Sequence, residues 1–234
     1  MKENYGFFTC DMMHHAHSQT RNALLSCENL KAAHSGRLLY HHVGFSLMEG
    51  ACMVISGDNG SGKSTMLRQI AGIAPQYGEC IWFDTMIKSA ADYDRDMVYI
   101  GDKHGLYDTF TVSEQLHFFA KHYGNTLLID ATIHYLEFEP YLNINVSALS
   151  AGWKRRLALS RLLLIPSLLW LLDEPMMHLD AHSTTLLGGL IQSHCEKGGA
   201  CIMTMPYMDI NPVIYDTPIT LLHMHDFISD EEPY

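Results

Sequence analysis

The sequence predicts an α/β fold built around a largely parallel sheet. From about residue 23 onwards, short apolar runs of strand length alternate with segments that have helical patterning. Alternation of this kind is typical of α/β proteins with a parallel sheet. The second observation is the run GDNGSGKST at 57–65, which lies between an apolar run and a helix-like segment. A glycine-rich loop in that position favours the same fold class and points to phosphate binding.

Each expected strand is a short apolar run. ACMVISG at 51–57, for example, contains Val and Ile and ends in a glycine, which fits a buried strand. The expected strands are 51–57, 79–84, 97–102, 167–174 and 200–205.

The expected helices carry start and stop signals. TVSEQLHFFAKHYG at 111–124 begins with a Thr or Ser cap and ends in Gly124. The segment 63–72 has spaced apolar positions and ends in Gly72. The expected helices are 63–72, 111–124, 128–138 and 150–165.

Residues 1–22 show no periodicity, and we interpret them as an N-terminal extension of unknown order. Residues 23–234 would then form one domain, a size that a single fold with an inserted subdomain can fill. Because the stretch of about 103–152 is mostly helical between core strands, we expect a helical subdomain there.

Composition narrows the classes of function. The formal net charge of −11 disfavours a nucleic-acid binder, which would usually carry a basic face. The cysteines at 10, 27, 52, 80, 195 and 201 form no CxxC pair, so we expect reduced core thiols. The apolar run 162–172 contains Pro166 and falls short of the roughly 20 residues of a membrane span. We therefore expect a chain that is soluble by itself, with no secretory signal at its start.

The run at 57–65 fits the pattern G-x-x-x-x-G-K-[ST] through Gly57, Gly62, Lys63 and Ser64. In this pattern backbone N–H groups wrap nucleotide phosphates, the lysine reaches the β- and γ-phosphates, and the serine hydroxyl ligates Mg²⁺. The phosphates then lie at a helix N-terminus, where the helix dipole favours anions. We expect ATP and Mg²⁺ here. The remaining candidate nucleotide-binding residues of the loop are Asp58, Asn59, Gly60, Ser61 and Thr65.

The strand LLWLLDE supplies a second half of the site. Its Asp173 is placed to hold Mg²⁺ through water, and Glu174 is placed to orient or deprotonate an attacking water. A strand that ends in two acids is by itself only a solvated strand end. Together with the phosphate loop, it predicts a nucleotide-hydrolysing site with Glu174 and Lys63 as its catalytic residues.

Between these halves lies LSAGWKRRLALSRLLL at 149–164. With GDNGSGKST and LLWLLDEP, this run makes residues 23–209 closely resemble the ATP-binding subunits of ABC transporters. The resemblance implies a P-loop NTPase core of the ABC ATPase type, with an N-terminal antiparallel β portion and a helical subdomain. It also implies that Ser150, Ala151 and Gly152 contact the ATP held by a second copy, and it places Asp180 in the D-loop. A serine hydroxyl and N–H groups at a helix start suit an anion.

Within this family, LLSCENL at 24–30 and YIGDKHGLYDTFTVSEQL at 99–116 are similar to the haem exporter branch of cytochrome c maturation. That likeness implies integral membrane transporter subunits as partners and a homodimer of ATP-binding subunits. It also implies a peripheral place on the cytoplasmic face of the inner membrane. His34 lies near the position where the family stacks an aromatic ring on adenine. It fits equally well as a loop histidine with no role in binding.

Three positions depart from the family pattern. The bridging glutamine aligns with Lys103, the signature's final glutamine with Trp153, and the switch histidine with Pro206. Removing one preorganised donor typically costs roughly 10²–10³-fold in rate. Lys103 would partly neutralise phosphate charge. His178 or His182 would substitute for the switch histidine, although the simpler interpretation is that both are surface histidines. We still expect hydrolysis.

Two other functions stay open. A degenerate ABC protein would bind ATP and dimerise, with little turnover, as an assembly module. A small-molecule kinase would use the same phosphate loop, but the signature at 149–153 disfavours it. The basic trio Lys154, Arg155 and Arg156 is expected to form a solvated helix face.

Overall fold

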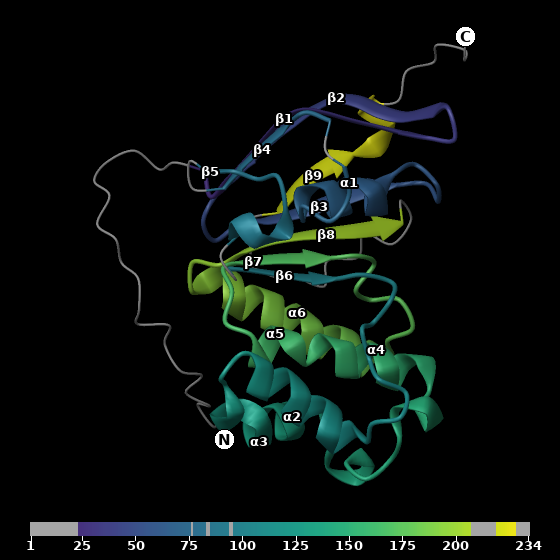
Figure 1. Cartoon of the computed structure of the whole chain (residues 1–234), viewed down its shortest axis with the longest axis vertical. Coiled ribbons are helices and arrows are strands. Elements are labelled where there is room, and N and C mark those ends of the chain that lie inside the picture. Colours follow the sequence, from purple (N-terminus) through teal and green to yellow (C-terminus); the bar gives the residue numbers. More distant parts are fainter. Residues whose placement is uncertain (1–22, 76, 83–84, 94–95, 207–218, 228–234) are drawn as a thin grey trace.

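Two sheets and two groups of helices form the layers of the computed structural model in Figure 1. A four-stranded sheet lies at one end, a five-stranded sheet follows, and most of the helices gather at the other end. The predicted α/β class is confirmed. The structure describes residues 23–75, 77–82, 85–93, 96–206 and 219–227.

The larger sheet is parallel throughout its five strands. Alternate residues of each strand face opposite sides. Leu169 and Leu171 pack in the core next to the smaller sheet, whereas Trp170 and Leu172 pack in the core next to the helices. Both faces are therefore buried, which is why these strands are nearly continuous apolar runs. The strands in sheet order are β6 (Met97–Ile100), β7 (Leu169–Leu172), β8 (Ala200–Pro206), β3 (Cys52–Gly57) and β9 (Ile219–His223).

The smaller sheet is antiparallel and supplies the N-terminal β portion that the family resemblance implied. Helix α1 (Lys63–Ile70) packs between the two sheets (Figure 1) and fills their shared core. Of the six cysteines, the five in the described residues are free and buried, as expected for core thiols, and Cys10 lies outside them. The strands in sheet order are β2 (Arg37–Leu47), β1 (Leu25–His34), β4 (Glu79–Trp82) and β5 (Thr85–Met86).

On the far face of the parallel sheet, two short helices lie where the sequence predicted a single one. The segment 150–165 was expected to be one helix, but it is broken at Ser160. The Ser160 hydroxyl donates to the Leu157 carbonyl at 2.7 Å, and this local bond competes with the helical ladder. The helices are α4 (Ala151–Leu159), α5 (Arg161–Leu164) and α6 (Ala181–Glu196).

A third core lies among helices at the end of the molecule away from the smaller sheet (Figure 1). It joins α2 (Val112–His122) and α3 (Ile129–Tyr135) to α4 and α5. Helix α2 begins as its sequence predicts, because Thr111 and Glu114 form a reciprocal capping box. The helical subdomain of about 103–152, and the extension 1–22 outside the described residues, stay predictions.

Candidate functional site

The candidate site lies where neighbouring parallel strands end at one edge of the sheet. Strand β8 lies between β7 and β3, and its Thr204 is in register with Ile55 and two positions before Pro206, which pairs with Gly57. The phosphate loop follows β3, and the acidic pair follows β7. The carboxyl edge of such a sheet is where α/β proteins bind ligands.

The loop at 57–65 needs its glycines. Gly62 caps α1 with φ 100°, and a β-carbon there would lie 2.9 Å from the Tyr40 ring. Gly60 also has a positive φ of 83°. Lys63 is buried, and its Nζ donates to the Gly57 carbonyl at 2.8 Å and the Asp58 carbonyl at 3.1 Å. The buried Ser61 hydroxyl has no partner among the described residues. A loop that holds an unsatisfied hydroxyl and a folded-back lysine fits a phosphate ligand.

Ser64 and Asp173 meet although they are far apart in sequence. The Ser64 hydroxyl donates to Asp173 Oδ1 at 2.9 Å, and Thr204 donates to the same carboxylate oxygen at 2.7 Å. A hydroxyl and a carboxylate are oxygen ligands of the kind that Mg²⁺ prefers. The residues present therefore fit a magnesium ion.

Glu174 is held in an uncommon backbone conformation with φ 45°. Its N–H donates to the Thr204 hydroxyl at 2.8 Å, and its Oε1 lies 3.8 Å from Lys63 Nζ. A non-glycine residue at positive φ is strained, and such strain gathers at functional sites. Thr204, on the neighbouring strand β8, therefore positions both acids, and the sequence analysis missed it.

Thr204→Val is expected to lower the free energy of unfolding by about 1–3 kcal/mol, because the Glu174 N–H loses its acceptor and the buried Asp173 carboxylate keeps only one of its two hydroxyl donors, that of Ser64. Urea unfolding of the full chain measures this change. Thr204→Ser keeps the hydroxyl and should stay closer to the native value. Equal stability of Thr204→Val and the native chain would contradict the assigned role.

A cavity of about 280 Å³ opens at these strand ends. It brings Ser64, Asp173 and Glu174 together with side chains from two other segments, the turn after β6 and helix α4. The residues that line it are Ser64, Arg68, Asp102, His104, Arg155, Asp173, Glu174, Met177 and His178.

Arg155 corrects the expectation of a solvated basic trio. Arg155 is 2% exposed, and its guanidinium donates to three main-chain carbonyls at or next to residues that line the cavity. Burial lowers the pKa of Arg155, although Asp173 and Glu174 oppose this. The acceptor carbonyls are those of Gly101, Asp173 and Pro175.

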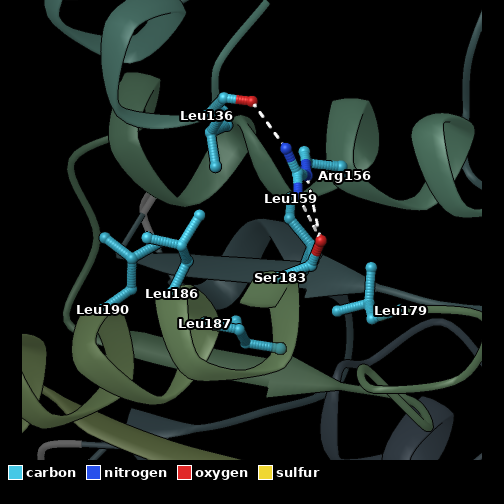
Figure 2. Close-up of a pocket in the computed structure, with 8 residues that line it drawn as sticks. All are labelled: Leu136, Arg156, Leu159, Leu179, Ser183, Leu186, Leu187 and Leu190. Atoms are coloured by element: carbon cyan, nitrogen blue, oxygen red, sulfur yellow. Dashed lines mark hydrogen bonds between the residues drawn. The ribbon is translucent and has the colours of Figure 1, made fainter. Parts of the chain in front are cut away.

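Arg156 is buried too, on a different side of α4. Figure 2 shows it between α3 and α6, where it donates to the Leu136 carbonyl and the Ser183 hydroxyl above a small leucine-lined pocket. It also pairs with Glu137 at 3.1 Å. This pocket is apolar and remote from the phosphate loop, so it belongs to the packing of the helices. Of the trio, Lys154 alone is partly exposed.

The remaining candidate residues lie outside this cavity. Ser150 caps α4, and its exposed hydroxyl accepts from the Trp153 N–H. A β-carbon on Gly152 would lie 2.7 Å from the His178 carbonyl. The signature motif at 149–153 therefore packs against the D-loop of the same chain. His34 ends β1 in an exposed position. Their roles in binding stay predictions.

The structure places Lys103, one of the family departures, and the two histidines that were offered as substitutes for the switch histidine. Lys103 is exposed and does not line the cavity, whereas its neighbour His104 does. His182 pairs with Glu137 at 3.0 Å and is therefore engaged elsewhere. His178 lines the cavity from an exposed position.

This fold, with a phosphate loop and an acidic strand end at one cavity, defines an ATP-binding domain. The chain belongs to the ABC transporter family, whose sequence model matches residues 40–177. The predicted membership is confirmed. Among solved structures, an ABC transporter ATP-binding protein from Pyrococcus furiosus superposes with a TM-score of 0.73 at 19% identity, over 88% of this chain and 99% of the other. At that identity the likeness shows the fold alone.

Relatives that are similar in sequence identify the branch of the family, which the likeness in fold does not. The cytochrome c biogenesis ATP-binding export protein CcmA of Wolbachia pipientis is 36% identical over 77% of this chain and 88% of that protein. The protein of the same name from Cereibacter sphaeroides is 38% identical over 76% of this chain and 80% of its own length. These relatives confirm the predicted likeness to the cytochrome c branch. Within the described residues, no helix is both long and apolar enough to cross a membrane.

Proposed function

We propose that this chain binds and hydrolyses ATP as a subunit of a membrane export complex that serves cytochrome c biogenesis, with haem as the cargo. The observation that carries the proposal is the cavity that collects Ser64, Asp173 and Glu174 beside Lys63. The names of its relatives support the biological setting.

The residues divide the work by their chemistry. Backbone N–H groups of the loop and Lys63 would bind the phosphates, and Ser64, with Asp173 through water, would hold Mg²⁺. When bound, Mg²⁺ neutralises charge on the phosphates. Glu174, set beside Lys63 at the end of β7, would orient the attacking water and accept its proton.

Ser150 and Gly152 support a two-copy arrangement. They do not line the cavity of their own chain, and Ser150 is exposed at the start of α4. We therefore propose that they complete the site of a second copy, as the family resemblance implies. Membrane subunits at the cytoplasmic face of the inner membrane would receive the resulting motion.

A second candidate function is an ATP-dependent assembly module with little turnover. Pro206 favours it, because it ends β8 opposite Gly57 and offers no hydrogen-bond donor at that place. The difference between the two functions lies in turnover, not in binding.

Co-expression with the membrane subunits of such an export system tests the proposal. The full chain should enter the membrane fraction only when those subunits are present, and the purified complex should release phosphate from ATP repeatedly. Membrane association with tight ATP binding but less than one phosphate released per bound nucleotide would favour the assembly module. A complex that binds no ATP would exclude both functions.

A further inference from the structure

The cavity wall carries four side chains with nitrogen donors, but two of these are already engaged. Arg155 donates to the carbonyls of Gly101, Asp173 and Pro175. Arg68 lies 3.8 Å from Asp102 and is partly exposed. Neither side chain is therefore fully available to a ligand, which leaves the two histidines of the wall.

His104 differs from His178 in what surrounds its ring. Nδ1 of His104 is buried and has no hydrogen-bond partner among the described residues, whereas His178 is exposed and can bond to water. A buried polar atom without a partner is uncommon in proteins and calls for a physical explanation. The arrangement that costs least buries only the Nδ1 lone pair and places the ring proton on Nε2, the nitrogen that is left for a ligand in the cavity.

The backbone of His104 is fixed even though its ring is unpaired. The half-buried Arg161 side chain donates to the His104 carbonyl at 3.2 Å, which anchors this turn after β6. Burial, and then the charges of Arg155 and Arg161, lowers the pKa of His104 from its ordinary value. The ring is therefore neutral at pH 7 and keeps one N–H donor, while phosphate oxygens are acceptors.

We propose that His104 is a phosphate-binding residue that donates a hydrogen bond to the terminal phosphoryl group of the bound ATP. This inference rests on the proposed function, because it takes ATP as the ligand of the cavity. Ser64, Asp173 and Glu174 line one part of that cavity and His104 lines another, so one ligand can reach both.

The affinities for ATP and ADP, compared in a chain that does not hydrolyse, separate this role from a structural one. In a Glu174→Gln background, His104→Ala should raise the Kd for Mg-ATP by about tenfold or more, the usual effect of losing a hydrogen bond to a charged group. The Kd for Mg-ADP, which lacks the terminal group, should stay the same. Calorimetric titration of the full chain with both nucleotides measures this.

Two further variants sharpen the test. His104→Gln keeps a donor and should retain more of the preference for ATP than His104→Ala. His117→Ala removes an exposed histidine of α2, away from the cavity, and should change neither affinity. An unchanged ratio of ATP to ADP affinity in His104→Ala, or an equal loss of both, would overturn the inference. Failure of the Glu174→Gln parent to bind either nucleotide would instead overturn the proposed function.

Discussion

Replacing Glu174 with Gln is expected to lower the rate of ATP hydrolysis by about 10²–10⁴-fold, the usual contribution of a positioned general base. The amide has nearly the same shape but accepts no proton from water. Lys63, Ser64 and Asp173 are untouched, so Mg-ATP should still bind. Phosphate release by the complex and equilibrium binding of ATP measure the two effects separately.

Glu196→Gln is a matched control, because Glu196 ends α6 and contacts Gln192 away from the cavity. It should hydrolyse ATP at the native rate. Native turnover in Glu174→Gln would show that another group activates water. Equally slow phosphate release in the native and Glu174→Gln complexes, with ATP bound in both, would support the assembly module.

The parts of the site that the sequence predicts are those encoded locally. The loop at 57–65 needs glycine at positions with positive φ, so its residue types reveal its geometry. The acids at 173 and 174 follow an apolar run, and the parallel sheet brings that strand end to the edge where the loop lies. The phosphate loop and the acidic strand end are far apart in the sequence, but each is a short continuous pattern that can be recognised by itself.

Other parts depend on strand order and on the direction of side chains. Thr204 reaches Asp173 and Glu174 only because β8 lies between β7 and β3, an order that no local pattern encodes. After β6 the chain exposes Lys103, which aligns with the family's bridging glutamine, and places His104 in the cavity wall, an arrangement that the alignment alone does not predict. Both facts follow from tertiary packing.

Charge patterning failed for the basic trio for a different reason. Three consecutive cations on a helix normally face water, but consecutive helical residues point in directions about 100° apart. Arg155 therefore turns to the strand ends and Arg156 to the α3–α6 junction. Main-chain carbonyls satisfy the guanidinium of Arg155, so its burial is tolerated without a directly bonded carboxylate partner.

Arg155→Met is expected to lower the free energy of unfolding by at least about 3 kcal/mol, because three carbonyls near the cavity lose their donor and each unsatisfied buried group costs about 1–3 kcal/mol. Methionine keeps much of the volume, so the loss reports hydrogen bonding and charge more than a void. The two carbonyls of Gly101 and Asp173 follow β6 and β7, and Arg155 joins these strand ends to α4. Urea unfolding of the full chain measures the change.

Lys154→Met changes the adjacent cation and serves as the matched control. Lys154 lies 3.4 Å from Asp108, which is exposed, and such surface pairs contribute about 0–1 kcal/mol. A large loss in Arg155→Met with a small one in Lys154→Met would follow from the two environments. Similar small losses in both would mean that water replaces the guanidinium at the three carbonyls. Arg155 would then not be needed to hold the ends of β6 and β7 to helix α4.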